Sequence, residues 1–172
     1  MKKLLSIIVA ILCMTVTVQA QDKGDMAAGV HFAIGTGDGF TNMGMGAKFQ
    51  YNVIDKLRLE PSFTYFLKKD NLSMWDISAN VHYQFVLSDV VNLYPLAGLS
   101  VMGVKVSVPS VDLGEYGSYE GGSASDTEFG FNIGGGADFK VSDKITVNAE
   151  LKYKIGGNWN RFIIGAGVAY RF

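Results

Sequence analysis

The segment Lys144–Ile155 has the sequence KITVNAELKYKI, in which polar and apolar residues alternate at every position. The apolar set consists of Ile145, Val147, Ala149, Leu151, Tyr153 and Ile155. The polar set consists of Lys144, Thr146, Asn148, Glu150, Lys152 and Lys154. Successive side chains of a β-strand point to opposite faces, so the pattern predicts a strand with one apolar and one polar face. A helix is disfavoured, because the apolar residues do not recur at spacings of three and four.

The same alternation recurs through the chain and predicts eight strands. They span residues 26–36, 44–54, 57–67, 74–87, 92–105, 127–141, 144–155 and 160–172. Three of the connections are short and contain an Asp that can bond its own backbone: 54–56, 88–90 and 142–144. The other four are longer or richer in Gly, Asn and Ser. In an up-and-down meander, short turns and long loops then fall at opposite ends. We predict an all-β fold, an eight-stranded antiparallel up-and-down β-barrel.

The first twenty residues have the features of a secretory signal peptide. Lys2 and Lys3 are followed by the apolar run Leu4–Val18, and Val18-Gln19-Ala20 provides small residues for cleavage. A membrane anchor is the alternative, but the run is short for a transmembrane helix, which needs about 20 apolar residues. We therefore expect a signal peptide at residues 1–20 and a barrel domain at residues 21–172.

Cysteine content and charge exclude several classes of function. Cys13 is the only cysteine and lies in the expected signal peptide, so the mature chain would have neither a disulfide framework nor a cysteine-based zinc site. Loss of Lys2 and Lys3 takes the basic residues from 15 to 13, against 16 acidic residues. This slightly acidic balance does not indicate a nucleic-acid partner.

Strand length and aromatic placement favour a transmembrane barrel over a soluble barrel of the lipocalin type. The strands are near the 9–11 residues that a tilted membrane strand needs. Aromatic residues gather at the short-turn end (Tyr51, Phe85, Tyr94, Phe139, Tyr170, Phe172) and at the loop end (Phe40, Tyr65, Trp75, Phe129, Trp159, Phe162). Two such girdles are typical of the two lipid–water interfaces. The polar face must then line the lumen, because each central Lys in lipid would cost about 2–4 kcal/mol.

These features together resemble the small eight-stranded outer-membrane β-barrel proteins, such as the OmpX/Ail-type proteins and the OmpA transmembrane domain. The resemblance covers the signal peptide, the eight strands, the Asp-containing turns and the terminal sequence GVAYRF. It implies a monomer in the bacterial outer membrane, in contact with outer-membrane lipid. It also implies that Val168, Tyr170 and Phe172 form an assembly signal read by the outer-membrane insertion machinery.

The predicted lumen is rich in charged residues. They are Lys48, Arg58, Glu60, Asp76, His82, Asp138, Lys140, Glu150, Lys152, Lys154 and Arg171. An eight-stranded barrel has an interior about wide enough for side chains to fill. The residues can therefore form a closed plug of ion pairs or line a narrow water-filled path. His31 and His82 lack a clear third ligand, so we interpret them as hydrogen-bonded residues and expect no metal and no cofactor.

The segment 107–126 is the most distinctive connection. It contains the acidic and aromatic residues Asp112, Glu115, Tyr116, Tyr119, Glu120 and Asp126, with Gly and Ser between them and no Lys or Arg. Tyr, Ser and Gly are a composition used at adaptable binding surfaces. The segment is a candidate contact for an extracellular protein or glycan, or else a solvated loop that covers the barrel. Its ends could also extend the flanking strands outward as a protruding hairpin.

Three functions follow, in order of preference. The first is a structural or surface-interaction protein with a lumen filled by side chains. The second is a small porin-like channel. The third is a lipid-modifying enzyme, which we rank last because no Ser–His pair lies at a lipid-facing rim. We expect a protein without enzymatic activity.

Overall fold

The computed structural model describes residues 23–37, 39–107, 111–112, 118–119, 121–157 and 159–172. Eight long strands build the fold: β1 (Met26–Gly37), β2 (Phe40–Ile54), β3 (Leu57–Lys69), β4 (Leu72–Tyr83), β6 (Val91–Ser107), β9 (Ser123–Lys140), β10 (Ile145–Ile155) and β11 (Arg161–Arg171). Three short strands complete it: β5 (Phe85–Val86), β7 (Val111–Asp112) and β8 (Ser118–Tyr119). No helix in the described part of the chain is long and apolar enough to cross a membrane.

The long strands form one antiparallel sheet that closes on itself. Strand β1 pairs with β11 as well as with β2, with Val30 opposite Val168. Strand β4 pairs with β6, with Ser78 opposite Ser100, and this pairing joins the two ends of the sheet. The predicted eight-stranded up-and-down barrel is therefore confirmed, with strand ends within a few residues of the predicted ones.

Two of the short turns are held by serine hydroxyls. The Ser88 Oγ accepts a hydrogen bond from the Val91 backbone N–H (3.1 Å), and the Ser142 Oγ accepts one from the Ile145 N–H (3.1 Å). In the third turn, the Asp55 carboxylate accepts a hydrogen bond from the backbone N–H of Lys23 (3.3 Å). The two serine contacts close their own turns, and the Asp55 contact ties the turn between β2 and β3 to the residues that precede β1.

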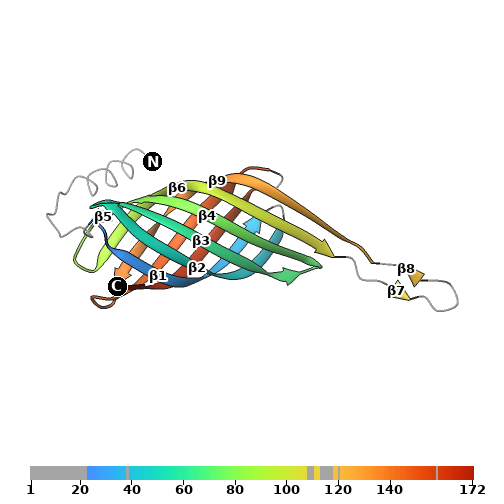
Figure 1. Ribbon diagram of the computed structural model, residues 1–172, viewed down its shortest axis with the longest axis horizontal. Helices are drawn as coiled ribbons and strands as arrows, with labels where there is room; N and C mark the ends of the chain where they lie inside the picture. The colour runs from blue at the N-terminus through green and yellow to red at the C-terminus, as the bar shows by residue number, and fades with distance from the viewer. Residues whose placement is uncertain (1–22, 38, 108–110, 113–117, 120, 158) are drawn as a thin grey trace, which may run out of the picture.

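Strands β6 and β9 are longer than the others and continue past the loop end of the barrel (Figure 1). Their pairing continues to Ser107 opposite Ser123, whereas the pairing of β9 with β10 ends at Phe131 opposite Ile155. Beyond that point, β9 has a neighbour on one side only. The β7–β8 hairpin lies farther out, at the end of the molecule opposite the C-terminus (Figure 1).

The alternation of the sequence separates the two faces of the barrel wall. On β3, Arg58 and Glu60 are buried inside the barrel, whereas Leu59 and Phe63 are exposed on the outside. The same order holds on β10, where Lys152 and Lys154 are buried and Leu151 is exposed. A barrel wall with an apolar outer face and a polar inner face is suited to contact with lipid on the outside.

Candidate functional site: a filled polar lumen

Arg58 organises the part of the lumen nearest the short turns. Its Nη1 lies 2.6 Å from the Asp138 Oδ2, and its Nε donates to the His82 Nδ1 (3.2 Å). Its guanidinium also lies over the Tyr94 ring, 4.8 Å from the centroid. The His82 and Tyr94 rings are stacked, with centroids 4.5 Å apart and planes at 5°. Four side chains from β3, β4, β6 and β9 are thus interlocked across the barrel.

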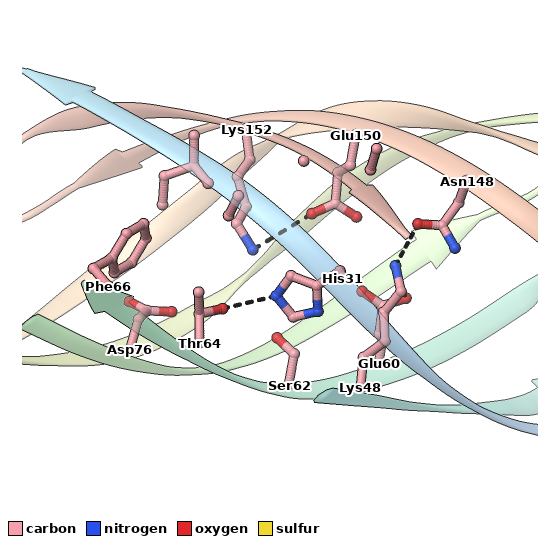
Figure 2. Close-up of a pocket in the computed structure, with 14 residues that line it drawn as sticks. His31, Lys48, Glu60, Ser62, Thr64, Phe66, Asp76, Asn148, Glu150 and Lys152 are labelled. Atoms are coloured by element: carbon pink, nitrogen blue, oxygen red, sulfur yellow. Dashed lines mark hydrogen bonds and ion pairs between the residues drawn. The ribbon is translucent and has the colours of Figure 1, made fainter. Parts of the chain in front are cut away.

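A second group of ion pairs (Figure 2) meets this cluster where the Glu60 Oε1 lies 3.9 Å from the His82 Nε2. The Lys48 Nζ lies 3.4 Å from the Glu60 Oε2 and donates a hydrogen bond to the Asn148 Oδ1 (2.8 Å). The Lys152 Nζ lies 3.4 Å from the Glu150 Oε1. Each carboxylate therefore has a cationic partner within the lumen, which offsets part of the cost of burying both charges.

One ligand-like cluster occurs here, and its chemistry does not favour a metal ion. One atom each from Glu60, His82 and Glu150 lie within 4.8 Å of one another. However, Arg58 donates to the His82 Nδ1, so the neutral imidazole carries its proton on Nε2, the nitrogen that faces Glu60 at 3.9 Å. A protonated ring nitrogen cannot bind a metal. Both carboxylates also face lysines, so the cluster is better suited to ion pairing.

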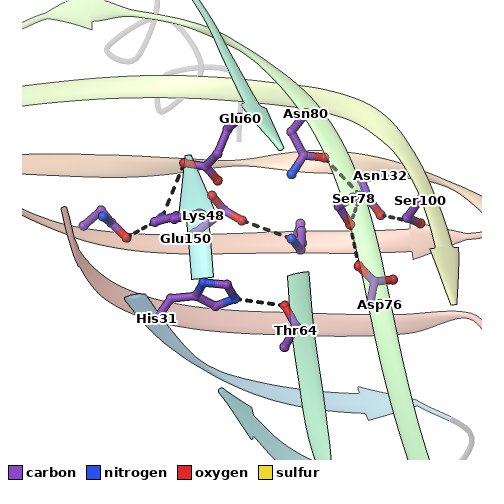
Figure 3. A network of polar contacts seen from close by, with 12 residues as sticks. His31, Lys48, Glu60, Thr64, Asp76, Ser78, Asn80, Ser100, Asn132 and Glu150 are labelled. Atoms are coloured by element: carbon purple, nitrogen blue, oxygen red, sulfur yellow. Dashed lines mark hydrogen bonds and ion pairs between the residues drawn. The ribbon is translucent and has the colours of Figure 1, made fainter. Parts of the chain in front are cut away.

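The middle of the lumen is held by Asp76 and a chain of small polar groups (Figure 3). The Asp76 carboxylate lies 2.9 Å from the Lys154 Nζ and accepts a hydrogen bond from the Ser78 hydroxyl (2.5 Å). The Asn132 amide donates to the Ser78 Oγ (3.1 Å) and to the Asn80 Oδ1 (3.0 Å). This chain joins β4 to β9, the two strands on either side of β6.

The charges of the described lumen balance. Its five cationic side chains are Lys48, Arg58, Lys152, Lys154 and Arg161, and its five carboxylates are Glu60, Asp76, Glu128, Asp138 and Glu150. A lumen with no net charge exerts no net electrostatic attraction on cations over anions, or the reverse. The balance favours a plug over a charge-selective channel.

An apolar layer that the sequence analysis missed closes the loop end of the lumen. It consists of Ala33, Phe66, Leu72, Met74, Met102, Val104 and Ile163, with Phe40 and Trp159 packed against it. The aromatic pattern assigned Phe40 and Trp159 to the lipid interface, and their packing against this layer corrects that assignment. The signal was present in Phe66, which occupies a lumen position in the alternation of β3.

The wall of the barrel is shaped to hold its largest inward side chains. Tyr94 was predicted at the lipid interface, but its side chain is buried inside the barrel. An added Cβ at Gly136, on the neighbouring strand β9, would lie 2.5 Å from the Tyr94 hydroxyl. Gly136 therefore provides the space in which the phenol ring stacks on His82.

Little free space remains between these groups. A cavity lined by His31, Lys48, Glu60, Thr64, Glu150 and Lys152, among others, has room of about 20 Å³ for water-sized groups (Figure 2). That is enough for roughly one buried water. The His31 Nε2 lies 2.9 Å from the Thr64 Oγ1 at its wall. In the part that the structure describes, the lumen is therefore largely filled by side chains.

The structure places most of the predicted lumen residues in these clusters. Those inside are Lys48, Arg58, Glu60, Asp76, His82, Asp138, Glu150, Lys152 and Lys154. Lys140 and Arg171 end β9 and β11, two positions after the buried Asp138 and Ala169, and lie half-buried at the turn-end rim, where the Arg171 Nη1 is 3.8 Å from the Asp25 Oδ2.

The other predicted residues lie at the two ends of the barrel. Val168, Tyr170 and Phe172 are exposed on the outer face at the turn end. On the loop side, Asp126 is exposed on the extended part of β9, and Asp112 and Tyr119 belong to β7 and β8. Glu115, Tyr116 and Glu120 lie outside the described residues, as does the expected signal peptide.

Sequence comparison identifies the family. The model of the outer membrane protein β-barrel domain family matches residues 6–172. The chain belongs to this family. The comparison with curated proteins finds no match.

Solved structures confirm the fold at low sequence identity. Neisserial surface protein A has a TM-score of 0.64 and 21% identity, over 86% of this chain and 96% of that one. The attachment invasion locus protein Ail of Yersinia pestis has a TM-score of 0.62 and 17% identity, over 87% and 99%. The N-terminal β-barrel domain of OprF from Pseudomonas aeruginosa has a TM-score of 0.61 and 17% identity, over 88% and 100%. The chain is thus an eight-stranded barrel of the outer-membrane type.

Proposed function

We propose that this protein is a non-enzymatic outer-membrane barrel with a closed lumen and a structural or surface-interaction role. The filled lumen is the observation that carries the proposal. Ion pairs and hydrogen bonds occupy the turn-end and middle parts, and the apolar layer occupies the loop end. A porin-like function would need a water-filled path through all of these parts.

The extended β6–β9 hairpin supports contact with a partner outside the cell. Along Ser123–Thr127, β9 pairs with β6 on one side and extends beyond the last β9–β10 pair on the other. Its side chains are small or acidic, without the Lys or Pro that usually protects an exposed strand edge. An extended peptide can add to such an edge through backbone hydrogen bonds. An extracellular protein segment is therefore a suitable partner, and a glycan is the alternative.

Related structures carry names that agree with a surface role, although each name describes that protein alone. Ail is named as an attachment invasion locus protein and was also solved with the heparin analogue sucrose octasulfate, at 18% identity and a TM-score of 0.58. Identities at this level support the fold only. The acidic 107–126 segment makes an anionic glycan a poor match for this chain, because like charges repel.

We also propose that residues 1–20 direct export and are cleaved, and that the mature chain is a monomer with its short turns in the periplasm. The short-turn end carries the C-terminus and the predicted assembly signal, and the opposite end carries the long hairpin (Figure 1). This orientation agrees with the usual arrangement of short periplasmic turns and longer outer loops.

Thiol labelling tests the closed lumen. Ser78→Cys, in a chain with Cys13→Ser, would place a thiol in the middle of the lumen, where Ser78 is buried. A small water-soluble maleimide should label this variant only after unfolding, while Asp126→Cys on the exposed hairpin should react in the folded state. Rapid labelling of Ser78→Cys in the folded barrel would favour the channel.

Labelling of whole bacteria tests the surface role. A polyethylene-glycol maleimide too large to enter the periplasm should label Asp126→Cys but not Asp89→Cys, which lies exposed in a short turn. The reverse result would place the hairpin inside the cell and overturn the surface-interaction proposal.

A further inference from the structure

Three successive rows of residues cross β3, β4 and β6 on the outer face of the barrel near the loop end. The row nearest the middle of the barrel is apolar, and the next row towards the loop end contains two aromatic residues. The strand pairing gives their members: Phe63, Ile77 and Val101 in the apolar row, and Tyr65, Trp75 and Gly103 in the aromatic row. Successive rows are two residues apart, which is about 7 Å along a strand.

The third row, closest to the loop end, is cationic. Near the end of β3 the pairing with β4 shifts by one residue, so Leu67 and Lys68 both oppose Ser73. Ser73 pairs on its other side with Lys105 of β6, and both lysines are exposed. Neighbouring strands are about 4.8 Å apart, so the backbones of the two lysines lie about 10 Å apart, on either side of Ser73.

The positive charge of this row is not neutralised by its described surroundings. Neither of its two lysines forms an ion pair within the described residues. The nearby Lys69 donates from its Nζ to the Thr41 backbone oxygen (2.8 Å), and Asp70 is the one carboxylate of the connection between β3 and β4. On β9, Asp126 lies opposite Val104, whose side chain is buried, so Asp126 belongs to the inner row. The outer face of this sector therefore carries an excess of positive charge.

The aromatic row indicates the depth of this sector in the membrane. An added Cβ at Gly103 would collide with the Trp75 indole, so the ring lies against the backbone of β6. Tyr65, on the other side of Trp75, is exposed on the outer face. Aromatic residues at the ends of barrel strands lie at the lipid–water interface. The two lysines are therefore expected at the level of the lipid headgroups, and the apolar row at the level of the acyl chains.

We propose that Lys68, Ser73 and Lys105 bind the phosphate of an anionic lipid whose acyl chains lie along the aromatic and apolar rows. Two ammonium groups and a hydroxyl donor between them match the charge and the acceptor oxygens of a phosphate. A phosphomonoester headgroup suits two lysines best, because it carries between one and two negative charges near neutral pH. The site depends on the proposed membrane placement of the loop end, but not on a closed lumen or on a surface partner.

Trp75 lies in the proposed site and reports contact with lipid. The chain has two tryptophans, so Trp159→Phe leaves Trp75 as the only one and keeps an aromatic ring in the apolar layer. The folded barrel would be placed in phosphatidylcholine nanodiscs that contain either phosphatidic acid or phosphatidylcholine with brominated acyl chains, at equal mole fractions. Bromine quenches tryptophan fluorescence on contact, and free phosphate carries no bromine. We expect Trp75 to prefer phosphatidic acid by about tenfold or more, because each lysine near a membrane surface contributes about fivefold.

Two variants remove the charges of the site, and one is a matched control. Lys68→Gln and Lys105→Gln should each reduce the preference for phosphatidic acid by about fivefold. Lys56→Gln makes the same change in net charge in the turn between β2 and β3, at the opposite end of the barrel, and should leave the preference unchanged. All three lysines are exposed, so the variants should fold as the parent chain does.

Equal quenching by the two brominated lipids in the parent chain would overturn the proposal. A preference that persists in the folded double variant Lys68→Gln/Lys105→Gln would also overturn it, as would an equal reduction by Lys56→Gln, since the attraction would then follow net charge alone. A preference that is lost in the double variant and kept in Lys56→Gln would support it. The nanodisc presents the same lipids at both faces, so failure here would leave the cellular orientation to the labelling of Asp126→Cys.

Discussion

Arg58 and Asp138, which lie 80 residues apart in the sequence, form a buried ion pair of 2.6 Å across the lumen. Arg58 also contacts His82 and Tyr94, so the pair joins strands from opposite halves of the chain. Because almost no water reaches either side chain, this contact stabilises one arrangement of the barrel interior and closes its turn end.

Removal of one partner of this pair should be strongly destabilising. Asp138→Asn leaves the Arg58 charge buried without its carboxylate, and we expect a loss of about 3–5 kcal/mol in the free energy of unfolding. Urea unfolding in phospholipid vesicles, followed by tryptophan fluorescence, measures it. Asp126→Asn on the exposed hairpin is the control and should change stability by less than about 0.5 kcal/mol.

The double variant Arg58→Met/Asp138→Leu should recover part of this loss, because no unpaired charge then remains. Full recovery is not expected, since Arg58 also holds His82 and Tyr94. If the double variant lost as much stability as the single variants Arg58→Met and Asp138→Leu together, the two side chains would be energetically independent, contrary to the structure.

A charge on the outer face should prevent stable insertion. Leu151 lies in the middle of β10, is exposed on the outer face and pairs with Ile164 on β11. Leu151→Lys should destabilise the inserted barrel by about 2–4 kcal/mol, because the ammonium would lie in the hydrocarbon. Ser123→Lys, on the hairpin beyond the barrel, should have no measurable effect. Normal insertion of Leu151→Lys would contradict an outer face in contact with lipid.

The last residue should act in assembly more than in stability. Phe172 is exposed, its backbone N–H bonds to the Met26 oxygen (3.1 Å), and its ring lies 6.4 Å from that of Phe49. Deletion of Phe172 should lower the amount of barrel in the outer membrane, measured by membrane fractionation. Phe139→Ala removes another exposed aromatic at this end and should leave the amount nearly unchanged. Equal amounts of wild type and the deletion would argue against an assembly signal.

The space at Gly136 should be required for the stack of Tyr94 on His82. Gly136→Ala would force the Tyr94 ring from its position, and we expect a loss of about 1–3 kcal/mol, typical of an overpacked interior. Near-ultraviolet circular dichroism should report the altered Tyr94 environment. Gly122→Ala, in open surroundings, provides the comparison. An unchanged spectrum and stability for Gly136→Ala would mean that the ring adjusts freely.

The alternation of polar and apolar residues predicted the fold, because every strand of a transmembrane barrel places one face towards lipid and the other towards the lumen. Lys152 and Leu151 differ by one position and must face opposite environments, so a period of two is visible in β10 without any tertiary information. The same rule indicated which face of β3 carries Arg58 and Glu60. Their partners could not be predicted, because Asp138 and Lys48 come from other strands whose relative register the sequence does not state.

The residues that were missed lie where both faces of a strand are apolar. On β6, Leu93 and Leu99 point outward while Tyr94 and Leu96 point inward, so polarity does not distinguish the two faces. Met102 and Val104, which belong to the apolar layer, lie on the same strand, whereas Phe66 was visible in the alternation of β3 and was overlooked. Arg161 was not among the predicted lumen residues, and the space that it occupies depends on Gly35, which comes from the other end of the chain.

Planar-bilayer conductance tests the closed lumen most directly. The folded chain would be inserted into the bilayer, and its insertion would be verified independently by protease protection of the barrel. The account predicts no stable single-channel steps, because ion pairs and the apolar layer around Phe66 fill the lumen. Reproducible steps of constant size from the inserted wild-type barrel would contradict it and would establish a channel.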